Sequence, residues 1–578
     1  MQNSNLKNKY VVKMIFIYIW LVILKNTDSV YSIYLFCAGG GLISVYFNEL
    51  HKINKFENKN HNILAIFFSI LIGIEISAAN WRIFYNGIKH IPGMVEGIGF
   101  ILGNIFMIAI TACIFFNIIL SLNYIVDYFQ AGKEKIISKK ERAFCFLIIV
   151  IADLIWMILY NYPTMLTVDS MNQLQQIMTG SYSNHHPYYY TRFIKICLDL
   201  GKIIFNNINC GFVIYSIVQI ILMSGTFTYL LTTVFKITEN KKVVILGLIY
   251  YIVMPFHISF ASTMWKDTLF SASVTAFCVA IYRIIRKIGN TKVDYFILIV
   301  SAIVSCMFRS NGLFAFIIST VIFCGLYRKK MLKITIIMIS VIIVSFLLKH
   351  VTLKQLNITQ ARTAESLSIP EQQIARVISD GCKLNKYEYN MINKLINVEI
   401  VKKEYKNYIS DPIKNRIDDS YLKKHKKEYL TLWYTIGRKY PDEYIKAWID
   451  QTRGYWNGGY DYWVCPDEPF YENNFGYQKK VIIKQGFRYF QLFRSEILKP
   501  VTSIGLYMWI LEIALLFSMI RKNKIGIFIC VPTLAVIISL LISTPVYCEF
   551  RYIYCLFTSF PLIICNFIIK DNKLNEQN

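Results

Sequence analysis

Asp169 is the first side chain of this 578-residue chain whose surroundings point to chemistry. It follows a hydrophobic run that ends near Tyr160, and His185 and His186 come shortly after it. A carboxylate at the edge of a hydrocarbon layer can accept the proton of an attacking hydroxyl, which is the task of a general base. The sequence therefore makes Asp169 a candidate catalytic residue, with the two histidines as candidate partners.

Further polar groups share this position at or beside the end of an apolar run. They are His257, Lys266 and Asp267; Arg309 and Asn311; Glu365; and Glu549, Arg551 and Tyr552. An enzyme that acts on a lipid phosphate needs cations at headgroup depth, because they hold the phosphate and stabilise its growing charge. Arg309 in particular lies at the end of one apolar run and directly before the next. An arginine at such a place more often contacts a phosphate than lacks a specific role.

Each group also has a purely structural interpretation. Charged side chains at span ends extend toward the interface, and Lys266 beside Asp267 can form a local ion pair of small energetic weight. Two adjacent histidines cannot comfortably bind one metal ion, so a polar turn is favoured over a metal site at His185 and His186. We predict no protein metal site, and dependence on a divalent cation stays open.

The composition predicts an all-α polytopic membrane protein. The chain is 55% hydrophobic and 17% charged, its mean hydropathy is +0.42, and its apolar residues are gathered into blocks. A helix needs roughly 17 to 25 mostly apolar residues to cross the hydrocarbon, which predicts about fourteen spans. The predicted spans are residues 10–24, 30–47, 63–79, 98–122, 143–160, 210–235, 243–261, 268–285, 294–308, 312–327, 331–348, 502–520, 524–543 and 553–569.

The distribution of basic residues predicts the orientation. The net charge of +26 comes largely from short runs between apolar blocks, such as residues 131–142 and 283–292. Such runs follow the positive-inside rule, so they indicate cytoplasmic connections and exclude the nucleic-acid partner that the charge alone would suggest. With fourteen spans, both termini are cytoplasmic and the candidate site residues lie on the outer face.

These spans divide the chain into four predicted regions. Residues 1–142 hold extra N-terminal spans, 143–349 a transmembrane core with a first outer loop at 161–209, 350–501 a soluble and mainly helical extracytoplasmic domain, and 502–578 the C-terminal spans. Cys382 and Cys465 fall in the outer domain and can pair there, although spacing alone does not establish a disulfide.

The order of the polar motifs resembles the GT-C superfamily of polyprenyl-phosphate-sugar-dependent membrane glycosyltransferases, and a group of bacterial polytopic proteins placed near it. The resemblance covers residue 143 to the C-terminus and rests on residues 167–170, 184–187, 265–267, 309–312, 365–370 and 549–552. It implies a GT-C-like helical bundle in the plasma membrane. Many GT-C enzymes carry a second acid close to the first, whereas no acid directly neighbours Asp169, which disfavours a metal-dependent variant.

The resemblance also implies an activity and a role for each candidate residue. A sugar would pass from a polyprenyl-phosphate carrier to a cell-envelope glycan or polymer, with membrane lipids as the surroundings and no certain cofactor. Asp169 would be the base; Lys266, Arg309 and Arg551 would hold the phosphate; the histidines would orient acceptor or phosphate; and Glu549 would fix Arg551. Asp267, Asn311 and Tyr552 complete the predicted substrate site.

Three alternatives remain open at the level of sequence. A polymerase or ligase of lipid-linked oligosaccharides would use similar arginine-rich outer loops. A transporter of lipid-linked sugars would need an inverted repeat and ionisable residues through the bundle, whereas the polar groups here gather on one predicted face. A non-catalytic assembly factor would tolerate loss of Asp169 but not of residues 350–501.

Overall fold

The computed structural model describes residues 58–82, 94–128, 137–458, 473–483, 487–495 and 497–567, and this part of the chain is helical without a β-strand. Its first half contains α3 (Lys59–Ala79), α5 (Met94–Tyr128), α6 (Lys139–Tyr160), α7 (Val168–Thr179), α8 (Tyr188–Phe205), α9 (Ile208–Thr238), α10 (Lys241–Val253), α11 (Pro255–Ala261), α12 (Lys266–Ile285), α13 (Thr291–Phe308), α14 (Gly312–Tyr327), η2 (Arg328–Met331) and α15 (Leu332–Leu347).

The second half begins with short helices and ends with long apolar ones; η marks 3₁₀ or π turns. Its elements are η3 (Leu348–Thr352), α16 (Leu353–Gln355), η4 (Thr363–Ser366), α17 (Ser368–Ser379), α18 (Lys386–Leu395), α19 (Val398–Glu404), α20 (Asp411–Lys414), α21 (Asp419–Lys424), α22 (Lys426–Lys439), α23 (Pro441–Thr452), η5 (Arg453–Tyr455), α24 (Phe487–Phe493), η7 (Lys499–Thr502), α25 (Ile504–Ile520), α26 (Lys524–Ser543), η8 (Phe550–Ile553), α27 (Tyr554–Thr558) and α28 (Phe560–Cys565).

Eight of the described helices are long and apolar enough to cross a membrane, and a ninth span results if α10 and α11, bent by 61° at Pro255, count as one. This number is below the predicted fourteen. Spans 10–24 and 30–47 lie outside the described residues, and α14 and α25 are short. The described part of the predicted span 553–569 is not one helix either: α27 ends at Thr558 and α28 begins at Phe560, with Pro561, which has no backbone N–H to donate, in its first turn.

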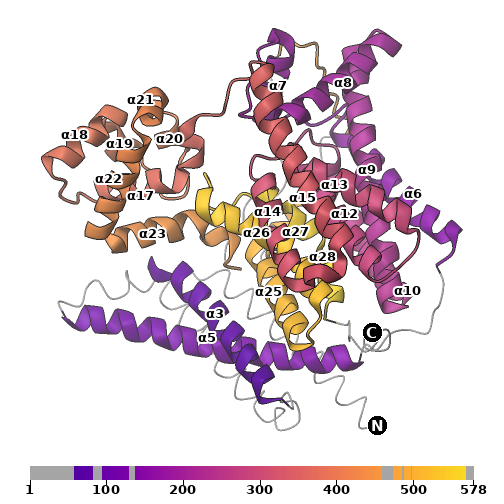
Figure 1. Ribbon diagram of the computed structural model, residues 1–578, viewed down its shortest axis with the longest axis horizontal. Coiled ribbons are helices and arrows are strands. Elements are labelled where there is room, and N and C mark those ends of the chain that lie inside the picture. Colours follow the sequence, from indigo (N-terminus) through magenta and orange to yellow (C-terminus); the bar gives the residue numbers. More distant parts are fainter. Residues whose placement is uncertain are drawn as a thin grey trace.

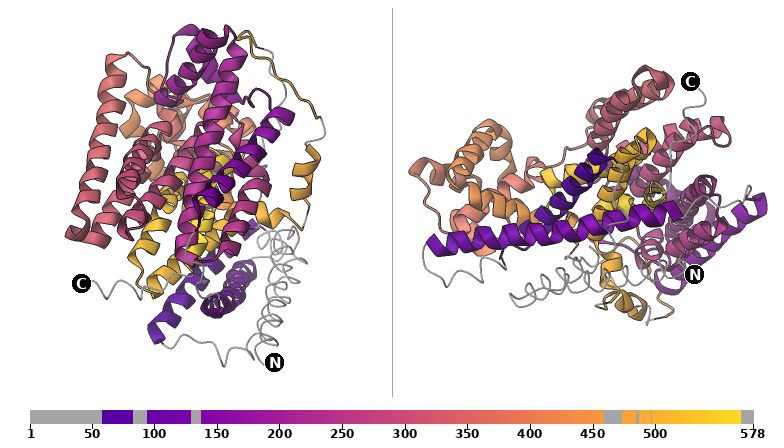
Figure 2. Two further views of the ribbon diagram at one scale, coloured as in Figure 1. Left: turned by 90° about the vertical axis from the view of Figure 1, so that its right-hand side faces the viewer. Right: turned by 90° about the horizontal axis from the view of Figure 1, so that it is seen from below.

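Most of the long helices run alongside one another in a bundle, whereas α5 runs across it (Figures 1 and 2). The most enclosed span is α12, with 89% of its apolar stretch buried inside the protein, against 22% for the span Leu332–Gln355. Helices α9, α13, α26 and α27 pack around α12. Lys266 is the first residue of α12, so its side chain projects from a helix that is fixed at the centre of the bundle.

Helices α17 to α23 lie to one side of the bundle, on the left in Figure 1, and pack around a separate hydrophobic core. They occupy part of the predicted outer domain, 350–501. Cys465 lies outside the described residues, so the predicted pairing with Cys382 has no structural description. Asp450 on α23 is fully buried and pairs with Arg82, 2.6 Å away beyond the end of α3, and with Arg376 on α17 at 2.8 Å. The pair between Arg82 and Asp450 connects the N-terminal helices to the side domain, which is formed by α17 to α23.

Glu371 is an unusual carboxyl in the core of this side domain. Its residue is 3% exposed, and neither oxygen has a hydrogen-bond partner within the described structure. It borders a small cavity of about 20 Å³ lined mainly by apolar side chains, among them Ile374 and Tyr429. Burial raises the pKa of Glu371 to about 8, although the positive charge of Lys414 opposes the shift.

The raised pKa predicts that the side domain loses stability as the pH rises. The folded form binds the proton of Glu371 more tightly than the unfolded form does, so its stabilising effect is complete below pH 4.5 and is lost by about pH 8. We expect Glu371→Gln to remove roughly 2 to 4 kcal/mol of this pH dependence. Hydrogen exchange of α17 in the full-length protein, corrected for intrinsic rates, measures it.

The matched control is Glu399→Gln, because Glu399 is exposed on α19 and pairs only with Lys402 in an i,i+3 contact. This variant should keep the wild-type pH dependence of α17. An equal pH dependence in Glu371→Gln and wild type would contradict the assignment to Glu371.

Candidate functional site

Asp169 lies in the first turn of α7, which begins with a reciprocal cap. The Thr167 hydroxyl accepts from the Ser170 backbone N–H, and the Ser170 hydroxyl interacts with the backbone N–H of Thr167. Two bonds tie this cap to the segment that precedes α12. Trp265 Nε1–H donates to the Thr167 hydroxyl at 2.7 Å, and the Ser170 hydroxyl donates to the Met264 carbonyl at 2.7 Å. The start of α7 is therefore fixed against the start of α12.

A short backbone ladder extends this contact. The Met165 N–H donates to the Ser262 carbonyl and the Met264 N–H donates to the Met165 carbonyl, each at 2.9 Å. Gln219 of α9 holds residues 260–263 of this ladder in place, because its fully buried amide donates to three backbone carbonyls. The acceptors are the carbonyls of Phe260, Ala261 and Thr263, at 3.0, 3.0 and 2.8 Å.

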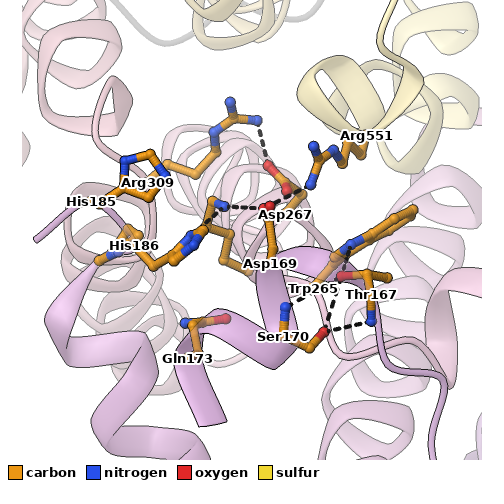
Figure 3. Close-up of polar contacts among 12 residues, drawn as sticks. Thr167, Asp169, Ser170, Gln173, His185, His186, Trp265, Asp267, Arg309 and Arg551 are labelled. Atoms are coloured by element: carbon orange, nitrogen blue, oxygen red, sulfur yellow. Dashed lines mark hydrogen bonds and ion pairs between the residues drawn. The ribbon is translucent and has the colours of Figure 1, made fainter. Parts of the chain in front are cut away.

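The result is a charged centre on one oxygen of Asp169, shown in Figure 3. Lys266 Nζ lies 2.6 Å and Arg551 Nη1 2.7 Å from Asp169 Oδ2. Glu549 Oε1 lies 3.3 Å from Arg551 Nε. Arg551 is part of η8, far along the chain, so three distant segments meet here. The candidates Asp169, Lys266, Arg551 and Glu549 are thus brought together by the fold.

The charges around Asp169 keep it ionised. Burial opposes ionisation, but the positive charges of Lys266 and Arg551 outweigh it and hold the pKa of this carboxyl well below its usual range. His186 Nδ1 lies 3.4 Å from Lys266 Nζ. Burial and the neighbouring Lys266 lower the pKa of His186 to about 3, so its imidazole is neutral at physiological pH.

A second ion pair lies beside this centre. Arg309 Nη1 is 2.5 Å from Asp267 Oδ1, and the two side chains are only 9% and 0% exposed. The same guanidinium donates to the Tyr552 carbonyl at 3.2 Å and lies 4.8 Å from the centre of the Tyr552 ring. Lys266 and Asp267 do not form a local ion pair, since adjacent residues on a helix point in different directions.

The remaining candidates make polar contacts with residues other than Asp169. His185 faces Glu365 at 3.8 Å, and Glu365 pairs with Lys414 of the side domain at 2.8 Å. The Asn311 amide donates to the Ser539 hydroxyl at 2.6 Å. His257 is buried and bonded to the Tyr554 hydroxyl at 2.8 Å, so it supports the bundle rather than the site.

The fold also contributes residues that sequence reasoning missed. Lys349 donates to the Arg309 carbonyl at 3.2 Å, and Trp265 and Gln219 hold the backbone that carries Lys266. Lys349 had a signal in the sequence because it follows directly on the predicted span 331–348, and Trp265 because it belongs to the motif 265–267, whereas Gln219 had none. In the part of the chain that the structure describes, no group of three or more His, Cys, Asp or Glu side chains is placed to hold a metal ion.

Comparison with known proteins gives one match. A family model described as a family of unknown function (DUF6020) matches residues 178–578. The matched range contains every predicted site residue except Asp169. No curated protein and no solved structure matches the chain.

The role of Gln219 leads to a stability prediction. Gln219→Leu removes a donor from three buried carbonyls, of which those of Phe260 and Thr263 keep a backbone donor and that of Ala261 relies on Gln219, and we expect it to destabilise the protein by about 2 kcal/mol. Gln175→Leu is the control, because Gln175 is exposed on α7. Equilibrium unfolding in mixed micelles measures both variants, and equal stabilities would show that Gln219 does not hold this segment.

Proposed function

Because the chain belongs to this family of unknown function, we propose its activity from its own site: it is an integral membrane glycosyltransferase. It would transfer a sugar from a polyprenyl-phosphate donor to a hydroxyl of a cell-envelope glycan. The observation that carries the proposal is the meeting of one carboxylate, Asp169, with two cations, Lys266 and Arg551, at 2.6 and 2.7 Å. A base and a phosphate clamp are the two parts that this reaction needs.

The position of the centre supports a lipid-linked donor. Asp169 follows the end of α6, Lys266 begins α12, and Arg309 follows the end of α13. These are ends of apolar helices of membrane-spanning length, so a ligand anchored in the bilayer would present its headgroup at their level. Basic residues occur at the opposite end of α12, at Arg283 and Arg286, which favours an extracytoplasmic site and cytoplasmic termini in a plasma-membrane protein.

In the proposed reaction, Asp169 takes the proton of the acceptor hydroxyl while that oxygen forms a bond to the anomeric carbon of the sugar. The bond between this carbon and the phosphate oxygen breaks, and the polyprenyl phosphate leaves with the electron pair. Lys266 and Arg551 stabilise the charge that develops on the leaving phosphate, as preorganised cations do. Their side chains are 13% and 17% exposed, so a ligand can reach them.

Arg309 has a different role in this proposal. Its side chain and that of Asp267 are more enclosed than the first two cations, and its guanidinium bonds the Tyr552 carbonyl next to Arg551. Arg309 is therefore a positioning residue that holds η8 in place. The side domain, whose Lys414 pairs with Glu365 near His185, would help to select the acceptor.

The proposed base gives a direct test. Asp169→Asn removes the proton acceptor, so transfer from a polyprenyl-phosphate sugar in membranes should fall at least about 100-fold. Asp199→Asn is the control, because Asp199 lies on the neighbouring helix α8 and pairs only with Lys195 at 2.7 Å. Transfer at the wild-type rate by correctly inserted Asp169→Asn would remove Asp169 from the mechanism.

A further inference from the structure

We propose that the Asp169 carboxylate is the resting occupant of the phosphate-binding site, and that the donor phosphate displaces it from Lys266 and Arg551. Donor binding would thereby set free the catalytic base. This inference rests on the proposed function and adds an order of events to it. The ligand class is a polyprenyl phosphate ester.

The first support is that both cations bind the same atom. Lys266 Nζ and Arg551 Nη1 lie 2.6 and 2.7 Å from Asp169 Oδ2. Hydrogen bonds between ionised partners at this distance are among the strongest in proteins. An incoming phosphate that needs these donors must therefore compete with Asp169 for them. The Asp169 side chain is 22% exposed, so it has a route by which to leave.

The second support is that each cation keeps another neighbour when Asp169 leaves. Arg551 Nε lies 3.3 Å from Glu549 Oε1, and its guanidinium lies 5.3 Å from the centre of the Trp265 ring. Lys266 Nζ lies 3.4 Å from His186 Nδ1. These contacts hold the two cations in place for a new anion.

His186 itself adds a donor to the site. The Lys266 ammonium can only donate, so His186 Nδ1 accepts and the ring proton is on Nε2. His186 is 2% exposed, and its Nε2 has no hydrogen-bond partner among the described residues. A buried N–H without an acceptor is costly, and a phosphate oxygen would satisfy it once the departure of Asp169 from Lys266 opens the enclosed ring to the site.

The third support is the charge balance of the reaction. When Asp169 takes the acceptor proton it loses one negative charge, and the phosphate gains one as the sugar–oxygen bond breaks. Lys266 and Arg551 therefore exchange one anionic partner, the carboxylate, for another, the phosphate. The exchange also makes Asp169 a better base, because the two cations hold its pKa well below the usual range while they are bound to it.

The test measures binding of decaprenyl phosphate to the full-length protein in lipid nanodiscs. Asp169→Asn removes the competing carboxylate, and we expect it to bind this probe about tenfold more tightly than wild type does. Lys266→Met and Arg551→Met should bind it more weakly, and the control Asp199→Asn should bind it with the wild-type affinity. Unchanged or weaker binding by correctly inserted Asp169→Asn would overturn the exchange.

A measurement on wild type avoids the question of whether a variant folds. The acid limb of kcat/KM reports the free enzyme and that of kcat the donor complex. If the donor displaces Asp169 from Lys266 and Arg551, the pKa of Asp169 is higher in the donor complex than in the free enzyme. The acid limb of kcat should then lie at higher pH than the acid limb of kcat/KM. Coincident acid limbs would overturn the exchange.

The two proposals fail in different ways. Tighter binding by Asp169→Asn without any sugar transfer by wild type would overturn the glycosyltransferase activity and keep the displaceable carboxylate at a phosphate site. Sugar transfer by wild type with unchanged probe affinity in Asp169→Asn would overturn the exchange alone.

Discussion

One carboxylate oxygen shared by two cations is the constraint on which the site depends. Asp169, Lys266 and Arg551 come from α7, α12 and η8, and each would be a buried or half-buried charge without the others. An unpaired charge in such surroundings costs several kcal/mol. The three segments must therefore meet with little tolerance, and the surrounding hydrogen bonds are arranged to hold them at that distance.

Much of that support comes from neutral side chains. Gln219, Trp265 and Ser170 bond backbone or hydroxyl groups between the start of α7 and the start of α12. The backbone groups of this segment are buried inside the protein, and a buried backbone group without a partner costs free energy. The same bonds that satisfy these groups fix the direction of Lys266, so the stability of the loops and the geometry of the site have one physical origin.

The second ion pair, between Asp267 and Arg309, holds a neighbouring segment of backbone in place. Asp267 is fully buried, and Arg309 bonds both its carboxylate and the Tyr552 carbonyl. Arg551 precedes Tyr552, so the enclosed pair stabilises the backbone that carries the more exposed cation. Enclosure thus separates two arginines that look alike in the sequence, because the Arg551 side chain is 17% exposed and that of Arg309 only 9%.

The sequence by itself determined the apolar blocks and the polar residues at their ends, because hydrophobic length and charge are local properties. It also placed Lys266 next to Asp267, but only the tertiary structure decided that Lys266 binds Asp169 while Asp267 binds Arg309. Adjacent residues of a helix point in different directions, so partners are chosen by the packing of α7, α13 and η8 around α12. The break between α27 and α28, by contrast, has a local cause in Pro561, whereas the contact of Arg551 in η8 with Asp169 depends on the packing.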